Sequence, residues 1–302
     1  MKERIAIIGC GLIGDSWAAL MTAFGHDVTA WDPSPRMTAD FETRVDKARK
    51  QVWQVMPGAR PATGNLTLAA TLEEALANVT WVQENAPEQL GLKQELYAQI
   101  ETYVSDRVIV ASSTSSLTWS ELSIGMRHPH RLITAHPFNP PHLMRLVEIY
   151  AAQDDMRARS VAFYAGLDRR PVVLHRDAVG HIANRLASAL WREAVNIVAE
   201  DIADVSAVDA ALVHGPGLRW SVMGAHMAYH LGGGEGGMAA YLKHLGPSQE
   251  RRWQTLGSPK LTPEVCEKLI DGVAVEAAGR SIASLALERD DALIRALRAK
   301  TQ

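Results

Sequence analysis

An apolar run that leads directly into a glycine motif most constrains the fold of this 302-residue chain. Residues 5–8 are Ile-Ala-Ile-Ile, without polar alternation, as expected of a parallel strand that is buried on both faces. Gly9, Gly11 and Gly14 follow in the spacing Gly-x-Gly-x-x-Gly, and residues 12–24 have the pattern of a helix. Strand, glycine turn and helix in this order predict the first unit of a doubly wound sheet.

The glycine turn has the chemistry of a dinucleotide-binding site. Gly9 permits a tight turn, Gly11 lets the backbone approach a diphosphate, and Gly14 lets the helix pack closely on the strand. The first amides of the helix, which include those of Leu12 and Ile13, have no helical partner and are aligned with the helix dipole. We therefore expect a diphosphate to bind at this helix start.

Asp32 directly follows the second predicted strand, residues 28–31, and lies about 20 residues past the glycines. A carboxylate at this position accepts hydrogen bonds from the adenosine ribose and repels a 2′-phosphate. The motif therefore predicts NAD, rather than NADP, as the cofactor. An accidental glycine turn in another α/β protein is the alternative, and it leaves the acidic residue unexplained.

Composition narrows the class of protein. The chain is 47% hydrophobic and 22% charged, as in ordinary globular proteins, and its net charge of −3 gives no support for nucleic-acid binding. No stretch has the roughly 18 uninterrupted apolar residues of a membrane span. Two cysteines, Cys10 and Cys266, suit a reducing compartment, so we expect a cytoplasmic protein. The histidines have no cysteine or carboxylate at ligand spacing, so no metal site is expected.

The predicted secondary structure changes after residue 178. Before it, apolar strands alternate with helical patterns, one of them at residues 36–53; after it, only helical patterns follow. We predict a Rossmann-type, doubly wound, mostly parallel sheet at residues 1–178, followed by an all-α substrate and dimerisation domain at residues 179–302. The apolar stripes of the second domain exceed the needs of one small core, which favours a homodimer. The remaining strands are predicted at residues 66–69, 79–83, 108–111, 132–135, 146–150 and 172–174.

His136 is the histidine best placed for acid–base chemistry. It directly follows the predicted strand 132–135 and precedes the rigid loop Pro-Phe-Asn-Pro-Pro. Glu148 lies in the apolar strand 146–150, where a carboxylate needs a partner because an isolated buried charge is costly. A loop that doubles back can place Glu148 against His136, to orient the imidazole and stabilise its protonated form. A purely structural His–Glu pair is the alternative.

Four segments together resemble the NAD-dependent L-3-hydroxyacyl-CoA dehydrogenase family, in order and in spacing. The resemblance implies that His136 is the general base, that Glu148 orients it, and that hydride passes to nicotinamide C4. It also implies that Ser115 and Asn184 form hydrogen bonds with the reacting oxygen and with groups on the substrate or nicotinamide side. The segments are residues 5–14, Ser113–Leu117, His136–Ile149 and Gly180–Leu186.

The family also carries residues that match Glu88 and Lys93, near the nicotinamide ribose. Within the family, the helical half is most similar to the L-carnitine 3-dehydrogenase branch, and less to the L-gulonate 3-dehydrogenase branch. Ser116 stands where the branch pattern has a glycine, Asn184 where some members have an aspartate, and His181 where an aromatic residue is usual, so the substrate stays open. The similar stretches are residues 189–194, 215–220, 229–238, 246–247 and 288–291.

A small-molecule L-3-hydroxy acid is the substrate that this resemblance implies, oxidised to the 3-oxo acid, with L-carnitine as the first choice. Its quaternary ammonium group donates no hydrogen bond, so recognition needs aromatic faces. Arg219 is a candidate for the substrate carboxylate. Core or interface packing is the alternative role of the candidate aromatic residues, which are Phe138, Trp220, Tyr229 and Trp253.

Three other functions remain open. A 3-hydroxyacyl-CoA, such as 3-hydroxybutyryl-CoA, needs a cationic contact for its 3′-phosphate, which the helical pattern 36–53 offers. L-Gulonate is a further substrate. A purely structural NAD-binding protein is the non-enzyme alternative, and the presence of all four proposed catalytic residues argues against it. The cations of the helical pattern are Arg44, Lys47, Arg49 and Lys50.

Overall fold

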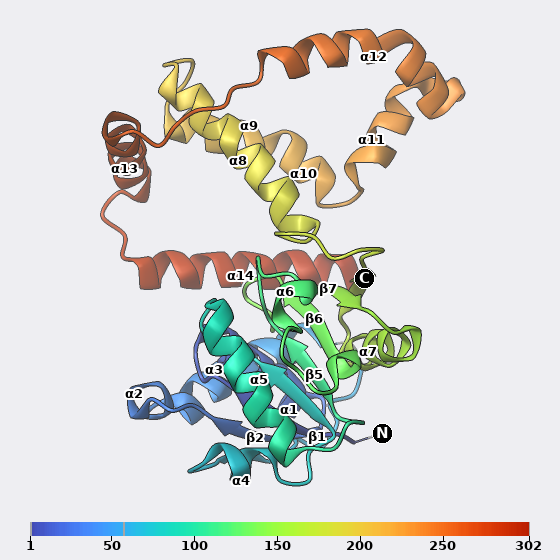
Figure 1. The fold of residues 1–302 in the computed structure, drawn as a ribbon. Helices are drawn as coiled ribbons and strands as arrows, with labels where there is room; N and C mark the ends of the chain where they lie inside the picture. Colours follow the sequence, from blue (N-terminus) through green and yellow to red (C-terminus); the bar gives the residue numbers. More distant parts are fainter. Residues whose placement is uncertain (1, 57, 302) are drawn as a thin grey trace. The chain divides into compact units, whose positions relative to one another are not determined.

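The computed structural model of the protein describes residues 2–56 and 58–301. The chain divides into two compact units (Figure 1). The first, which we call the sheet unit, contains residues 1–185 and 288–302, and the second, the helical unit, contains residues 186–287. Each is described by itself.

Eight strands form one sheet in the order β3-β2-β1-β4-β5-β6-β7-β8. All neighbours are parallel except β6 and β7, which are antiparallel. The predicted doubly wound, mostly parallel sheet is therefore confirmed, with its change of strand order beside β1. The strands are β1 (Arg4–Ile8), β2 (Asp27–Trp31), β3 (Leu66–Leu68), β4 (Trp81–Glu84), β5 (Ile109–Ser112), β6 (Leu132–Pro137), β7 (Leu146–Ala151) and β8 (Arg170–Val173).

Helices cover both faces of this sheet, which explains its continuous apolar strands. Ile5 and Ile7 of β1 belong to one apolar cluster with α1, α3 and α7, whereas Ala6 and Ile8 belong to a second cluster with α4 and α5. This division follows from the alternation of side chains along a strand. The helices are α1 (Leu12–Ala23), α2 (Pro35–Thr38), α3 (Phe41–Val55), α4 (Leu72–Leu76), α5 (Leu90–Tyr103), α6 (Trp119–Leu122), the 3₁₀ turn η1 (Pro129–Arg131) and α7 (Asp154–Gly166).

The single helix expected at residues 36–53 is wrong, because the chain forms α2 and α3 with a break at residues 39–40. Asp40 leaves the helical conformation, at φ −116° and ψ 18°. The guanidinium of Arg44 donates to the carbonyl of Met37, at 2.7 Å, which a continuous helix would need for the amide of Phe41. A contact of one side chain with the backbone thus ends the first helix.

After β8, helices are the only regular elements in the part of the chain that the structure describes. α8 begins at the last residues of the sheet unit, and the final helix, α14, returns to the sheet unit from residue 288 onward. Ile294 of α14 packs there against Val55 and Leu143 of the sheet unit. The observed division therefore differs from the helical domain predicted at residues 179–302, because the end of the chain belongs to the sheet unit. These helices are α8 (Ala183–Ala199), α9 (Val205–His214), α10 (Pro216–Trp220), α11 (Ala225–Gly232), η2 (Gly234–Gly236), α12 (Gly237–Thr255), α13 (Pro263–Ala277) and α14 (Ile282–Thr301).

Within residues 2–56 and 58–301, no helix combines the length and apolar character needed to cross a membrane.

Candidate functional site

The glycine turn between β1 and α1 has no room for a side chain at its first and third glycines. Gly9 has a positive φ of +95°, and a Cβ there would lie 2.7 Å from the carbonyl oxygen of Asn85. A Cβ on Gly14 would lie 1.9 Å from the carbonyl oxygen of Gly9. Around Gly11 the space is open, since a Cβ there would meet only the end of the Met37 side chain at 3.5 Å. The backbone at Gly11 can therefore be approached by a ligand.

The start of α1 offers free backbone donors. The first helical bond runs from the amide of Asp15 to the carbonyl of Gly11, at 2.8 Å. The amides of Leu12, Ile13 and Gly14 precede it and have no partner within the helix. Together with the helix dipole, they form a suitable place for a diphosphate.

Asp32 follows β2 and faces the glycine turn. Its carboxylate accepts a hydrogen bond from the amide of Cys10 and one from the amide of Ser34, each at 2.9 Å. Beside it lies a largely apolar cavity of about 550 Å³, which we call the Asp32 cavity. Gly9 and Gly11 line this cavity together with Trp31, Met37, Leu92 and Leu96. Its size and lining suit an adenosine group.

A second cavity, of about 400 Å³, lies at the ends of β5 and β6, and we call it the His136 cavity. Asn85 and Ala86 line both cavities. The turn after β4 thus separates two compartments, as the two halves of a dinucleotide require. The His136 cavity is lined by Ile13, Glu88, Ser113, Ser115, Pro137, Phe138, Asn139 and Asn184 as well as His136.

The antiparallel register of β6 and β7 sets Glu148 directly opposite His136. His136 Nδ1 lies 2.8 Å from Glu148 Oε2, and the amides of Ile182 and Ala183 donate to Oε1 at 2.8 and 2.9 Å. Burial would raise the pKa of Glu148, but these hydrogen bonds outweigh it and hold the pKa below its usual value. Because an ionised carboxylate only accepts, the proton must lie on Nδ1, which leaves Nε2 free to accept a proton.

Asn184 and Ser115 lie on the Nε2 side of His136. The Asn184 Nδ2 atom is 3.4 Å from His136 Nε2 and 3.4 Å from the backbone oxygen of Ser115. A hydroxyl, an amide and an imidazole thus line one cavity wall. Such groups can bind the oxygen of a hydroxyl substrate and remove its proton.

His181 is a neighbour of this site that was expected only as a departure from the family pattern. Its ring stacks on that of His136, with centroids 4.8 Å apart and planes inclined by 19°. His181 Nε2 lies 3.2 Å from the hydroxyl of Thr134. Burial lowers the pKa of His181, which favours a neutral ring beside the His136–Glu148 pair.

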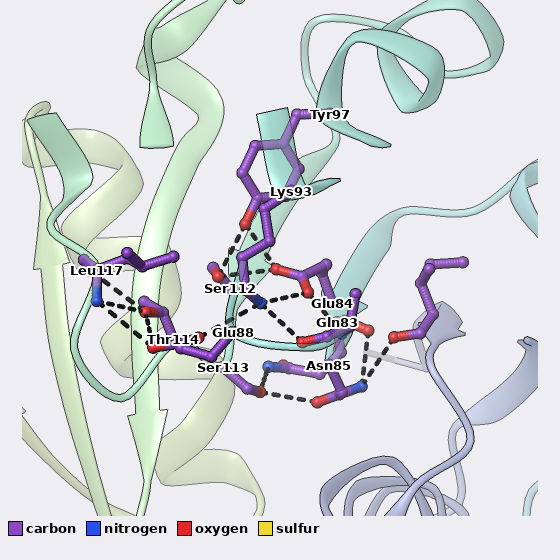
Figure 2. Close-up of polar contacts among 12 residues, drawn as sticks. Gln83, Glu84, Asn85, Glu88, Lys93, Tyr97, Ser112, Ser113, Thr114 and Leu117 are labelled. Atoms are coloured by element: carbon purple, nitrogen blue, oxygen red, sulfur yellow. Dashed lines mark hydrogen bonds and ion pairs between the residues drawn. The ribbon is translucent and has the colours of Figure 1, made fainter. Parts of the chain in front are cut away.

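Glu88 lines the His136 cavity and is held by the loop after β5. Its Oε1 accepts from the hydroxyl of Thr114, at 2.7 Å (Figure 2). It also accepts from the amides of Ser115 and Ser116, each at 2.8 Å. Burial acts to raise the pKa of Glu88, yet these donors and the cation of Lys93 lower it to about 2. Glu88 is therefore an anion that fixes the loop after β5, which contains Ser115 and Ser116.

Lys93, which the resemblance set near the nicotinamide ribose, lines neither cavity. Its side chain is 1% exposed, and Nζ donates to Glu84 Oε1 at 2.6 Å and to the carbonyl of Ala86 at 3.0 Å. Glu84 was missed in the sequence. The signal that could have found it is a carboxylate that directly ends an apolar strand, a position where a charge needs a partner.

Phe138 is the one substrate candidate of the sheet unit, among the described residues. It lines the His136 cavity, and its ring centroid lies 6.5 Å from that of His136 at an interplanar angle of 77°. The other candidates belong to the helical unit and are Arg219, Trp220, Tyr229 and Trp253. No group of three or more His, Cys, Asp or Glu residues that could hold a metal occurs in the described part of the chain.

Comparison with known proteins gives the family. A family model described as the NAD-binding domain of 3-hydroxyacyl-CoA dehydrogenase matches residues 4–178, and one described as its C-terminal domain matches residues 180–271. The chain is 42% identical to an L-carnitine dehydrogenase of Streptomyces griseus, over 98% of this chain and 90% of that protein. It is 40% identical to an L-carnitine dehydrogenase of Nocardiopsis dassonvillei, over 98% and 91%.

Solved structures share the fold. The crystal structure of an NAD⁺-dependent 5-formyl-3-hydroxy-2-methylpyridine 4-carboxylic acid 5-dehydrogenase has a TM-score of 0.80 and 24% identity, and covers 99% of this chain and 98% of that one. A 3-hydroxybutyryl-CoA dehydrogenase of Escherichia coli K12 has a TM-score of 0.61 and 26% identity, over 70% of this chain and 46% of that one. The glycine turn, Asp32 and the paired cavities fit the NAD that these relatives imply. This chain is an NAD-dependent oxidoreductase of 3-hydroxy acids that belongs to the 3-hydroxyacyl-CoA dehydrogenase family.

Proposed function

We propose that this chain oxidises L-carnitine to 3-dehydrocarnitine, with His136 as the general base. The observation that carries the chemistry is the 2.8 Å bond between His136 Nδ1 and Glu148 Oε2 beside the His136 cavity. The choice of substrate rests on relatives that are named L-carnitine dehydrogenase and are 36–42% identical over nearly the whole chain.

His136 takes the proton of the C3 hydroxyl on its free Nε2. Glu148 stabilises the imidazolium that forms, because its carboxylate already holds the opposite nitrogen. NAD, when bound, accepts the hydride at nicotinamide C4. The hydroxyl of Ser115 and the amide of Asn184 bind the substrate oxygen and hold the C3 hydroxyl toward the imidazole.

The cofactor residues act by shape and by charge. Gly9 and Gly14 let strand, turn and helix meet closely, and the amides of Leu12, Ile13 and Gly14 bind the diphosphate. Gly11 leaves open the space through which the diphosphate approaches the backbone. Asp32 binds the adenosine ribose, and Glu88 lies on the nicotinamide side, where it holds the Ser115 loop.

Recognition of a quaternary ammonium group calls for aromatic faces and no hydrogen-bond donor. Phe138 supplies such a face at the His136 cavity. We assign the remaining contacts to the helical unit, with Arg219 for the carboxylate and the aromatic side chains for the trimethylammonium group; these are Trp220, Tyr229 and Trp253. The proposal includes a cytoplasmic homodimer assembled through the helical unit.

A 3-hydroxyacyl-CoA is less well supported as the substrate. Two of the four cations suggested for its 3′-phosphate are already engaged. Arg44 pairs with Asp15 at 2.6 Å, and Arg49 pairs with Asp46. Only Lys47 and Lys50 remain as exposed cations of that group.

The test is the rate of NADH formation with L-carnitine, D-carnitine, 3-hydroxybutyryl-CoA and L-gulonate at equal concentrations. We expect a kcat/KM for L-carnitine that exceeds each of the others by at least about a hundredfold, which is 2.7 kcal/mol of differential transition-state binding. A preference for the CoA ester or for gulonate would overturn the substrate assignment and leave the family intact. NAD binding without turnover of any of them would favour a structural protein.

A further inference from the structure

His181 has a backbone conformation that is uncommon for a residue with a side chain. Its φ is +50°, in the left-handed region, and it follows Gly180, whose φ is +74°. The amide of His181 donates to the carbonyl of Ala178 at 3.0 Å, which closes a tight turn before α8. Glycine would form this turn at lower cost, because the left-handed region is disfavoured for a residue with a Cβ. The presence of an imidazole here therefore needs an explanation beyond the turn.

The turn directs the next two backbone amides at Glu148. The amides of Ile182 and Ala183 come directly after His181 and donate to Glu148 Oε1 at 2.8 and 2.9 Å. The other oxygen, Oε2, lies 2.8 Å from His136 Nδ1. The carboxylate is thus held by the chain that follows His181 on one side and by the imidazole on the other. The conformation of His181 accordingly fixes the group that orients His136.

The ring of His181 lies against the ring of His136, with centroids 4.8 Å apart and planes inclined by 19°. His181 is 3% exposed and is not one of the residues that line the His136 cavity. Its Nε2 lies 3.2 Å from the hydroxyl of Thr134, and its Nδ1 has no hydrogen-bond partner in the part of the chain that the structure describes. The ring therefore affects the cavity through its contact with His136.

This ring is neutral beside the His136–Glu148 pair. Burial, which has the largest influence, and then the ring of His136 lower the pKa of His181. The carboxylates of Glu148 and Glu88 and the backbone of Ser115 act in the opposite direction and are weaker. A neutral aromatic face attracts a cation that lies within about 6 Å of the ring. His136 becomes such a cation each time it takes a proton.

We propose that His181 is a positioning residue for the base. Its turn holds Glu148 against one side of the His136 imidazole, and its neutral ring stabilises the imidazolium that forms when the C3 hydroxyl gives up its proton. The stacked face attracts the protonated ring of His136 more strongly than the neutral one, so it makes His136 a stronger base. This inference rests on the proposed role of His136.

The pKa of His136 measures this stabilisation without any turnover. NMR of the protein with carbon-13-labelled histidine follows each imidazole as the pH changes, and the His136 signal is the one that His136→Gln lacks. His181→Leu and His181→Phe both introduce an apolar side chain and both lose the contact with Thr134, but only phenylalanine has an aromatic face. We expect His181→Leu to lower the pKa of His136 by about half a pH unit, and His181→Phe to keep it at or above the wild-type value.

Equal pKa values of His136 in His181→Leu and His181→Phe would overturn the inference, because the aromatic face would then have no effect. A higher pKa in His181→Leu than in the wild type would also overturn it, since the wild-type ring would then oppose protonation of His136. His128→Leu, the same change at an exposed histidine of the sheet unit, is the matched control and should leave the pKa of His136 unchanged.

A measurement on the wild type tests the inference even if a variant fails to fold. His181→Gly, which suits the left-handed turn, identifies the His181 signal by its absence. We expect His136 to take its proton at a higher pH than His181, so that His181 is neutral while His136 becomes charged. Protonation of both rings together, or of His181 first, would refute a neutral supporting ring.

The pH dependence of turnover separates this inference from the proposed function. If His136 is the base, the acid limb of kcat/KM for NADH formation from L-carnitine moves to lower pH in His181→Leu, by the same amount as the pKa measured by NMR. A shift of the NMR pKa without a shift of the acid limb would refute His136 as the base, and would leave the stabilisation of its imidazolium by His181 established.

Discussion

The sheet unit buries most of its large apolar side chains, whereas the helical unit leaves many of them exposed. On α1, Trp17, Leu20 and Met21 are fully buried, while on α13 Ile270 is 67% exposed and Val273 is 55% exposed. Both helices have apolar residues at helical spacing, so the difference lies in what covers them. In the sheet unit the cover is the sheet. We propose that a partner copy covers the exposed apolar side chains of the helical unit.

The same contrast applies to polar groups. The sheet unit buries charged and hydrogen-bonding side chains in closed networks, such as those of Glu84 and of Glu148. The sheet unit thus contains preformed polar networks beside both cavities, and we propose that assembly and most substrate contacts depend on the helical unit. Four experiments can break or sharpen that division.

The largest effect is expected for His136→Ala. Loss of the general base should lower kcat by about 10²- to 10⁴-fold, while NAD still binds within about twofold of the wild-type affinity. Stopped-flow measurement of NADH formation and calorimetry with NAD give the two values. His128→Ala, a change at an exposed histidine of the same unit, is the control that keeps full activity. Near-normal kcat in His136→Ala would show that the base lies elsewhere.

Gly14→Ala tests whether the glycine turn is built to fixed dimensions. The added methyl group would stand 1.9 Å from the Gly9 oxygen, so the helix start must shift. Such overpacking costs about 1–3 kcal/mol, which should weaken NAD binding by about tenfold or more. Gly91→Ala, where an added Cβ meets nothing within 4 Å, should bind NAD as the wild type does. Equal NAD affinities of the two variants would contradict the assignment of this turn.

Ile270→Glu/Val273→Glu tests the proposed cover of the helical unit. Two charges on one face of α13 should weaken a homodimer by at least about tenfold, because each apolar side chain contributes about 1.5–3 kcal/mol when buried. Light scattering during size exclusion should show twice the chain mass of 33.0 kDa for the wild type and a smaller mass for the variant. Ile124→Glu, at an exposed position of the sheet unit, should leave the mass unchanged. A monomeric wild type would remove this part of the proposal.

The smallest effect concerns acid stability. The pKa of Glu88 is about 2 in the folded chain, below its ordinary value of 4.5, so the ionised form stabilises the fold above pH 4.5. This contribution is lost as the pH falls from about 4.5 toward 2. Urea unfolding at pH 7, 5 and 4 should therefore show a smaller loss of stability for Glu88→Gln than for the wild type. Glu73→Gln, at an exposed site on α4, should lose as much stability on acidification as the wild type does. If Glu88→Gln also lost as much as the wild type, the pKa of Glu88 would not be lowered by folding.

The strands and the glycine turn could be predicted from sequence because their signals are local. Apolar runs mark the strands, and the spacing of Gly9, Gly11 and Gly14 marks the turn. The proximity of Glu148 to His136 also followed from local information, since a buried carboxylate on the next strand needs a partner. Each of these patterns is confined to one strand and its turn or to two strands that follow one another in the chain.

The features that escaped depend on contacts between distant residues. The break between α2 and α3 depends on a contact of Arg44, and the place of Lys93 depends on its pairing with Glu84. The end of the chain belongs to the sheet unit, where Ile294 packs against Val55 and Leu143, which are distant from it in the sequence. Periodicity identifies an apolar face and says nothing of which surface will receive it.

The antiparallel pairing of β6 and β7 has a consequence for how new specificities could arise. Because backbone register alone sets Glu148 opposite His136, residues 138–145 between the strands can change in length or composition without separating the pair. Phe138 lies at the start of that segment. If His136 is the base that we propose, selection or design can vary the adjoining loop to admit a different acid and leave the pair in place.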